Sequence, residues 1–333
     1  MSKKLIVVVG ATGNQGGSVA RRFLAAGYRV RGLTRNTTSP AATALASAGV
    51  EMVQADLDDV QSLKEAFRGA NAIFSVTNYW EPFFSGRAEA HEMDISCREY
   101  AYDVEFLQGK NIADAAATTV DTLDDNGFFA STLSHADKCS DGKFEELYHF
   151  DAKADIFPTY VNKKYPSLAA KMSCIHTGYF FTSYNILPNS YFKKNPDGTF
   201  TMAFATVPDK PVPHFEPVGD MGVFVYAVSQ MPSGKAYMAA GTTCTWPEFL
   251  ETWAKINDVK ASYKQVSPEE MVEATEDRET GIEVAAMYSY ASDPGYDGGM
   301  NLLTAVDLQK VSDASHRTQR RLGTFSVIST KNV

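Results

Sequence analysis

The chain has 333 residues, of which 44% are hydrophobic and 21% are charged, and its formal net charge at pH 7 is −9. This composition is that of a globular protein, and the negative charge argues against direct binding of nucleic acid. No apolar run approaches the length that crosses a membrane. The four cysteines lie far apart with no C-x-x-C pair, so we expect reduced thiols, no metal site and a cytoplasmic location, with the nucleus as an alternative.

The first predicted elements form a strand, a glycine turn and a helix. Five apolar residues, 5–9, predict a strand buried on both faces, and a segment with helical period follows from residue 18. Between them Gly10, Gly13 and Gly16 have the spacing G-x-x-G-x-x-G. We expect these glycines to permit a tight turn, a close approach to a pyrophosphate, and packing of the helix on the strand. This order indicates a dinucleotide site, and a turn without ligand is the less favoured alternative.

The second predicted strand, 28–34, leads to the place where an adenine ribose is expected to lie. An NAD site has Asp or Glu there, which accepts a hydrogen bond from the 2′-hydroxyl. This chain has Arg35 instead, flanked by hydroxyl side chains, and a guanidinium suits a 2′-phosphate. A solvated arginine at a strand end is the alternative. The sequence therefore predicts NADP(H) as the cofactor.

A third predicted strand, 50–55, is followed by a cluster of acidic residues. Asp56 and Leu57 are placed to border the adenine. The acid cluster 56–59 could equally cap the helix that follows, because Asp is favoured at helix N-termini. The two hypotheses are compatible, and the pattern favours neither.

The fourth predicted strand, 73–77, ends on Thr77 and Asn78. These residues lie at the carboxyl edge, where open α/β sheets hold ligands. Periodicity is then lost between residues 81 and 105, which predicts an irregular, mobile excursion that covers the site. A helix over 106–117 and a fifth strand over 127–133, which contains Ser131, are expected next.

Motifs along the chain resemble those of the NmrA-like family, an atypical branch of the short-chain dehydrogenase/reductases. They are Gly10-Ala-Thr-Gly-Asn-Gln-Gly-Gly17, Thr34-Arg-Asn36, Thr77-Asn-Tyr-Trp80, Ser131-Thr-Leu133 and His149-Phe-Asp-Ala-Lys153. A single motif of this kind is weak, whereas several in register are specific.

The resemblance implies a doubly wound Rossmann domain over 1–180 that binds NADP(H). It also implies a smaller α/β C-terminal domain, 181–333, in contact with it. The cofactor wall that it marks comprises Gly10, Thr12, Gly13, Asn14, Gln15, Gly16, Arg35, Asp56, Leu57, Thr77, Asn78, Tyr79, Lys138, Lys153, Thr177, Gly178, Tyr179 and Phe180.

Two pairs of residues have the four-residue spacing that places side chains on one helical face. Short-chain dehydrogenases use Tyr-x-x-x-Lys, which Tyr160 and Lys164 match, but Pro158 interrupts that stretch. In the family register Lys153 is the expected lysine and His149 takes the tyrosine position. We therefore expect Lys153 and His149 to be catalytic, since histidine can act as a general acid near neutral pH.

Two functions remain open from the sequence. The first is an NADPH-dependent oxidoreductase that reduces a small carbonyl, imine or enone compound, with His149 or a water supplying the proton. The second, which the family resemblance also implies, is a non-catalytic NADP(H) sensor that acts on transcription through regulatory protein partners. The charged His/Lys pair favours the enzyme, and the missing tyrosine favours the sensor. Formation of a homodimer is left open.

Overall fold

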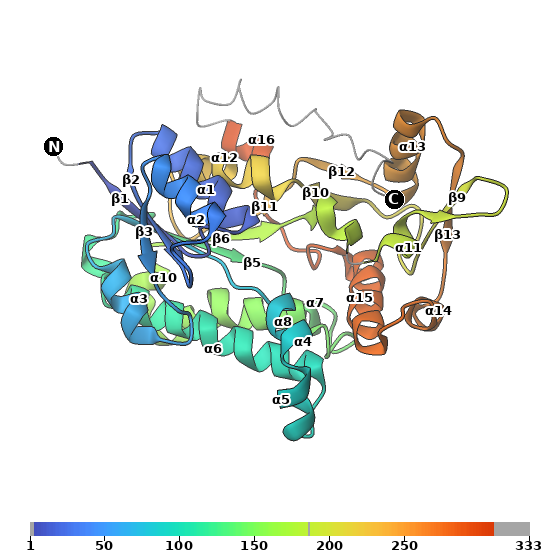
Figure 1. Cartoon of the computed structure of the whole chain (residues 1–333), viewed down its shortest axis with the longest axis horizontal. Coiled ribbons are helices and arrows are strands. Elements are labelled where there is room, and N and C mark those ends of the chain that lie inside the picture. Colours follow the sequence, from blue (N-terminus) through green and yellow to red (C-terminus); the bar gives the residue numbers. More distant parts are fainter. Residues whose placement is uncertain (1–2, 186, 310–333) are drawn as a thin grey trace.

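The computed structural model describes residues 3–185 and 187–309 of the chain. Its centre is a seven-stranded parallel sheet with the order β11-β6-β5-β4-β1-β2-β3. The strands are β1 (Leu5–Val8), β2 (Arg29–Thr34), β3 (Glu51–Gln54), β4 (Ala72–Ser75), β5 (Phe128–Thr132), β6 (Met172–Thr177) and β11 (Ala236–Ala239). The order runs outward from β1 in both directions, so the predicted Rossmann-type fold is confirmed (Figure 1).

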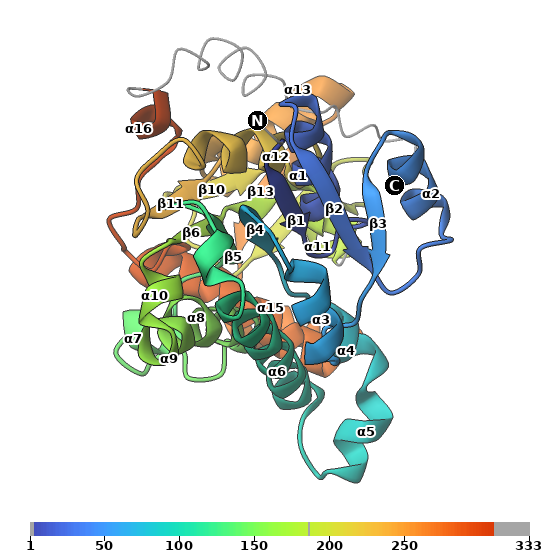
Figure 2. The same cartoon turned by 90° about the vertical axis from the view of Figure 1, so that its left-hand side faces the viewer.

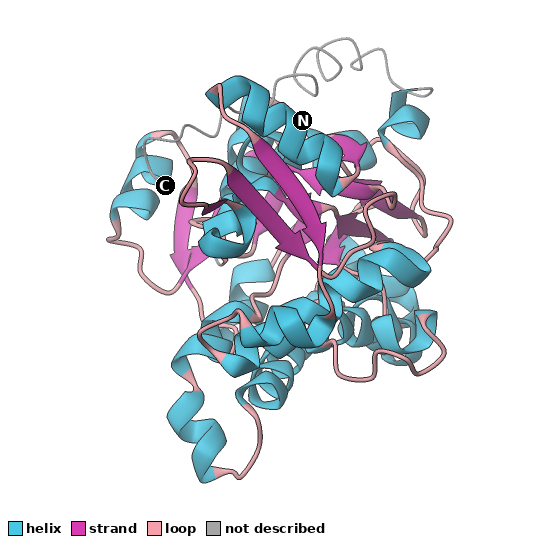
Figure 3. Ribbon diagram, turned by 90° about the vertical axis from the view of Figure 1, so that its right-hand side faces the viewer, coloured by secondary structure: helices cyan, strands magenta, loops and turns pink. Residues whose placement is uncertain are grey.

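Helices cover both faces of this sheet (Figures 1 and 3). The helices α1 (Asn14–Ala25) and α12 (Pro217–Val228) lie on one face, and α3 (Val60–Phe67) and α6 (Cys97–Ala117) lie on the other. All four residues of β1 are buried: Ile6 and Val8 pack toward α1, and Val7 packs toward α3 and α6. This explains the unbroken apolar run in β1, because a strand covered on both faces has no solvent side. Further helices in this part are α2 (Pro40–Ser47), α7 (Ala136–Cys139), α8 (Tyr148–Ala154), α9 (Val161–Lys164) and α10 (Pro166–Ala169).

Two elements from beyond residue 180 return to the central sheet. Strand β11 pairs in parallel with β6, and α12 packs along α1. The helices approach closely because α12 has Gly222 at the contact, whose backbone N–H donates to Ser18 Oγ at 2.9 Å. A Cβ at that glycine would lie 2.2 Å from the carbonyl oxygen of Ser18. Residues from both sides of position 180 therefore build the central layers. The division into 1–180 and 181–333 stays a prediction, and residues 310–333 lie outside the described part.

The rest of the C-terminal half builds two small sheets around an aromatic core. One sheet holds β7 (Tyr179–Phe180), β10 (Val212–Phe215) and β12 (Thr242–Cys244), and the other holds β8 (Lys193–Lys194), β9 (Phe200–Phe204) and β13 (Ala261–Gln265). The helices of this part are α11 (Pro188–Tyr191), α13 (Trp246–Asn257), α14 (Pro268–Glu273) and α15 (Arg278–Tyr290), whereas α16 (Ala305–Gln309) packs against α12 beside the central sheet. Phe204 stacks on Tyr288 with ring centroids 4.0 Å apart, and both pack against Trp246. This core fixes α15 beside the end of the central sheet.

The segment 81–105 is helical, which corrects the expected irregular excursion. It contains α4 (Trp80–Ser85), α5 (Arg87–Glu92) and the first turns of α6, and α5 protrudes from the body in Figure 2. Helix α6 begins at Cys97, after Ser96 caps it by accepting from the backbone N–H of Glu99. The apolar period is obscured because this helix also buries Arg98 and Glu105. A helix is predicted from apolar residues that recur about every 3.6 positions, and charged residues on the buried face interrupt that period.

In the described part of the chain, every helix is too short or too polar to traverse a lipid bilayer.

Candidate active site

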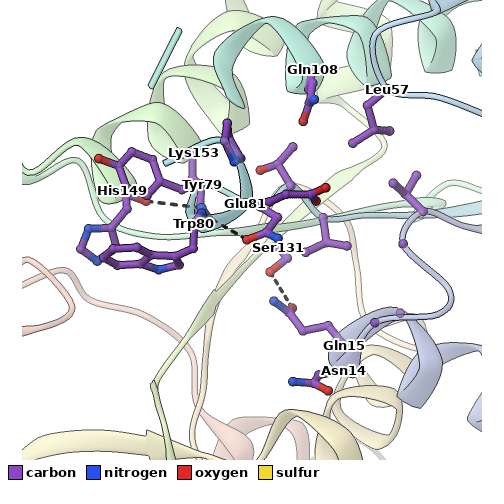
Figure 4. A pocket seen from close by; sticks show the side chains of 18 of the residues that line it. Asn14, Gln15, Leu57, Tyr79, Trp80, Glu81, Gln108, Ser131, His149 and Lys153 are labelled. Atoms are coloured by element: carbon purple, nitrogen blue, oxygen red, sulfur yellow. Dashed lines mark hydrogen bonds between the residues drawn. The ribbon is translucent and has the colours of Figure 1, made fainter. Parts of the chain in front are cut away.

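A cleft of about 900 Å³ opens at the carboxyl ends of the parallel strands. It contains almost all of the residues that the sequence predicted, brought together from separate segments of the chain (Figure 4). The predicted residues that line it are Gly10, Thr12, Gly13, Asn14, Gln15, Gly16, Arg35, Asp56, Leu57, Thr77, Asn78, Tyr79, His149, Lys153, Thr177, Gly178, Tyr179 and Phe180.

Lys138 is the predicted site residue that does not line the cleft. It lies on α7, and its ammonium is 3.3 Å from Asp155 Oδ1 in an exposed ion pair. Helix α7 follows the turn after β5, and His135 at its start pairs with Asp151 at 3.0 Å and with Asp155 at 3.1 Å. Lys138 is thus set apart from the other predicted residues, and its role at the cofactor stays a prediction.

The glycine turn between β1 and α1 has the geometry of an anion site. Gly10 has φ +61°, which side chains rarely tolerate, and a Cβ at Gly16 would lie 2.2 Å from the Gly10 carbonyl oxygen. Gly13 precedes the helix and makes no side-chain cap, so the first N–H groups of this twelve-residue helix stay free for a ligand. The turn therefore presents donors and a partial positive charge to the cleft.

Arg35 lies at the mouth of the cleft directly after β2. Its guanidinium forms an ion pair with Glu81 of α4, with Nη2 and Oε1 2.6 Å apart, and both side chains line the cleft. Within the acid cluster, Asp56 lines the cleft and Asp59 caps α3 by accepting from the backbone N–H groups of Gln61 and Ser62. The two hypotheses for this cluster thus apply to different residues.

The floor of the cleft links the glycine turn to β5. Ser131 Oγ donates a hydrogen bond of 2.8 Å to Gln15 Oε1, which Figure 4 shows across the cleft. Tyr79 is almost fully buried, and its hydroxyl donates to the carbonyl of Arg98. Burial raises the pKa of Tyr79 far above its ordinary value. The hydroxyl therefore stays neutral, and the side chain forms part of the cleft lining.

Lys153 extends from α8 into the cleft and is held by a buried carboxylate. Its Nζ lies 2.5 Å from Glu105 Oε1, and Thr77 Oγ1 donates to the same oxygen at 2.6 Å. Glu105 is on α6 and has no exposed surface. The lysine side chain is 14% exposed, so its charge is both paired and accessible to a ligand.

His149 precedes Lys153 by one turn of α8 and is held by a second buried carboxylate. Its Nδ1 lies 2.6 Å from Glu283 Oε1, and its backbone N–H donates to the same oxygen at 2.8 Å. Glu283 comes from α15 and has no exposed surface. The imidazole packs beside Trp80, with ring centroids 5.2 Å apart (Figure 4). Among the described residues, nothing bonds to its Nε2.

Tyr160 and Lys164 are not in the cleft. The helical backbone is interrupted at Phe157 (φ −124°, ψ 107°), directly before Pro158. This agrees with the break that was predicted from the proline. The Tyr160 hydroxyl donates to Asp114 at 2.7 Å and accepts from Lys164 at 2.7 Å. Burial raises the pKa of Tyr160 to about 12, with Asp114 acting in the same direction against Lys164. This tyrosine therefore lacks the environment of a proton donor.

One part of the cleft lining is apolar and aromatic. It includes Trp80, Leu187, Val284, Met287 and Tyr296. Tyr179, also in the lining, bonds through its hydroxyl to those of Tyr191 and Tyr288, and burial raises its pKa to about 12. This surface suits the apolar part of an organic substrate.

Sequence reasoning missed the two glutamates that hold Lys153 and His149. The available signal was a lone acid within an otherwise apolar helical stretch, as Glu283 is between Gly281 and Met287. Such a residue is buried only when it has a partner.

The model of the NmrA-like family matches residues 2–320 of the chain. The NmrA-like family domain-containing oxidoreductase ptmS of Penicillium ochrochloron is 28% identical over 292 residues, covering 80% of this chain and 77% of that protein. The similarly named oxidoreductase cpsB of Aspergillus campestris is 44% identical over 95 residues. That match covers 28% of each chain, so it spans less than a third of the cpsB protein.

Solved structures share the fold at low sequence identity. NmrA, a negative transcriptional regulator crystallised with NADP, has a TM-score of 0.68 and 19% identity, covering 96% of this chain and 95% of that one. The NADPH-dependent quinone oxidoreductase of Escherichia coli, complexed with NADPH, has a TM-score of 0.64 and 17% identity, covering 95% and 99%. These likenesses extend over both halves of the molecule.

Proposed function

The chain belongs to the NmrA-like family, and from this premise we propose that it is an NADP(H)-dependent oxidoreductase. Its substrate would be a small organic molecule with a carbonyl, imine or enone group. One observation carries the proposal. His149 and Lys153, one helical turn apart on α8, both line the cleft into which the glycine turn opens. In this proposal His149 would be the proton donor and Lys153 the ribose ligand beside a reduced nicotinamide.

The lining of the cleft fits NADP(H) at several points. The free N–H groups of α1 and the close-packed glycine turn suit the pyrophosphate. Arg35 would bind the 2′-phosphate, Lys153 the nicotinamide ribose, and the 177–180 segment would flank the nicotinamide. The two structural neighbours described above were crystallised with NADP and NADPH, which supports binding of NADP(H) here. NmrA was also crystallised with NAD, so the preference for the 2′-phosphate rests on Arg35.

Different side chains of the cleft would have different roles in a reduction. When bound, NADPH supplies the hydride. Glu105 fixes Lys153, which would donate to a ribose hydroxyl of the bound nucleotide and orient the sugar. As the substrate carbon accepts the hydride, negative charge develops on its oxygen, nitrogen or conjugated carbon, and His149 Nε2 delivers the proton there. Trp80, Met287 and Tyr296 exclude bulk water, which strengthens these interactions.

The proposal is tested by following loss of NADPH absorbance with a panel of quinones, ketones, imines and enones, with products identified by mass spectrometry. We expect turnover with at least one class, at a rate that saturates with substrate. The variant Lys153→Ala should lose that turnover, and Lys164→Ala, its counterpart outside the cleft, should keep it. Tight NADPH binding without any product would refute the enzyme.

A second function, an NADP(H) sensor acting through a regulatory protein, is favoured by the histidine that stands in place of the usual tyrosine. The structural neighbour NmrA is named a negative transcriptional regulator, which also supports it. In that case NADPH and NADP⁺ would bind without turnover and stabilise different surfaces. Hydrogen exchange of α4 and α5 with each nucleotide would detect the difference.

A further inference from the structure

Glu283 of α15 is fully buried and bonded to His149, and we infer that it is a positioning residue that fixes this imidazole for proton delivery. The inference rests on the proposed function, in which His149 Nε2 gives its proton to the substrate. It adds that the proton donor is completed by the C-terminal half of the chain.

One oxygen of Glu283 holds both the ring and the backbone of His149. Oε1 lies 2.6 Å from Nδ1 and accepts from the backbone N–H at 2.8 Å. Oε1 already accepts from the backbone N–H, and a carboxylate oxygen accepts further hydrogen bonds, so we assign the hydrogen of the neutral ring to Nδ1. The proton that the ring gains and gives away is then the one on Nε2, and Trp80 and Phe150 pack against the ring in this orientation.

Arg98 of α6 places a positive charge near this carboxylate, and it shares that charge with two other glutamates. Its Nη1 lies 3.9 Å from Glu283 Oε2, and its other guanidinium nitrogens pair with Glu279 at 3.1 Å and Glu146 at 2.9 Å. Burial lowers the pKa of Arg98, but the surrounding glutamates outweigh this effect and raise it, so the guanidinium keeps its charge. A buried acid with a cation nearby and two donors can remain an acceptor for the imidazole.

The position of Glu283 separates proton delivery from nucleotide binding. The glycine turn, Arg35 and Lys153 all precede residue 181, and Glu283 reaches His149 from α15, 134 positions along the chain. Among the described residues its hydrogen bonds go only to His149, so its loss should act on the chemical step. NADPH affinity should not change.

Kinetics of paired variants test this coupling in the full-length protein. Glu283→Gln removes the charge and keeps an acceptor, and Glu283→Met removes both in a side chain of similar length. We expect kcat to fall about 10-fold in the first and about 10²-fold in the second, with NADPH affinity unchanged. In a His149→Ala background, Glu283→Met should cause no further loss. Glu279→Gln, one turn earlier on α15 and also bonded to Arg98, is the matched control and should keep kcat.

Nitrogen-15 NMR of the His149 ring gives a readout that does not depend on turnover. We expect the neutral ring to carry its hydrogen on Nδ1 in the wild type, and Glu283→Met to shift it toward Nε2. An unchanged tautomer, or an equal loss of kcat from Glu283→Met with and without His149, would overturn the inference. Absence of turnover in the wild type would refute the proposed function alone, because the NMR result would still decide the role of Glu283.

Discussion

The chain carries two helical pairs with the same four-residue spacing, and their surroundings are opposite. His149 and Lys153 line the cleft, and each is held by a fully buried glutamate from another helix. Tyr160 and Lys164 share Asp114 of α6 outside the cleft. A four-residue spacing therefore shows only that two side chains lie on the same face of a helix. The neighbouring elements decide whether that face meets a ligand and whether its groups can move a proton.

The largest effect is expected from a variant that removes the predicted nucleotide site beside His149 and Lys153. Gly13→Val should abolish NADPH binding, because a branched side chain would fill the space for the pyrophosphate. The chain should stay folded, since Gly13 has an extended backbone (φ −88°, ψ 177°) that valine adopts. Thermal stabilisation by NADPH is the measurement, and unchanged stabilisation would show that the glycine turn is not the site.

The control for that variant is Gly16→Ala. A Cβ at Gly16 would lie 2.2 Å from the Gly10 carbonyl oxygen, compared with 3.3 Å at Gly13. We therefore expect Gly16→Ala to lower the melting temperature without ligand, which Gly13→Val should not do.

Lys153→Ala should weaken NADPH binding and stop turnover together, because this side chain holds the cofactor ribose. The expected loss in kcat/KM is about 10³-fold, from the combined loss of binding and orientation. Steady-state kinetics and nucleotide titration measure the two effects. Full binding with lost turnover would contradict the assigned role.

His149→Ala should leave NADPH affinity intact and slow the chemical step by about 10²-fold, the usual loss for a positioned proton donor. Single-turnover kinetics separate this step from product release. If the variant keeps its rate, a water in the cleft supplies the proton.

Arg35→Ala should weaken NADPH binding by about 10- to 100-fold, which corresponds to the roughly 1.5–3 kcal/mol of a charge-assisted hydrogen bond. Binding of NADH should not change, because it lacks the 2′-phosphate. Arg29→Ala, on the same strand and paired with Glu51, is the control. Equal affinities for NADPH and NADH in the wild type would exclude the predicted preference.

Tyr160→Phe should change neither binding nor turnover, since this residue lies outside the cleft. The same kinetic assays apply. An inactive Tyr160→Phe together with an active His149→Ala would reverse the choice between the two pairs.

The nucleotide half of the site could be predicted because its signals are local. The strand 5–8, the glycine turn and Arg35 follow one another, and each is constrained by its own backbone or by the strand end. The Rossmann fold follows from the same short-range pattern. Sequence spacing also predicted the pair on α8, with the family register deciding between two candidates.

The partners of that pair could not be predicted because they depend on tertiary packing. Glu105 meets Lys153 across 48 positions of sequence, and Glu283 meets His149 across 134. No local pattern relates such residues, and a buried acid also obscures the helical period around it. The return of β11 to the sheet was missed for the same reason.

That return has a consequence for how the chain folds. Strand β6 gains its outer neighbour, and α1 its cover, only when residues 217–239 arrive. Until then a growing or shortened chain presents an open sheet edge and an apolar helix face, both of which favour aggregation. Native contacts that span so much sequence also slow folding. The central sheet therefore contains strands from both parts of the chain, and it is complete only after residues 236–239 have emerged from the ribosome.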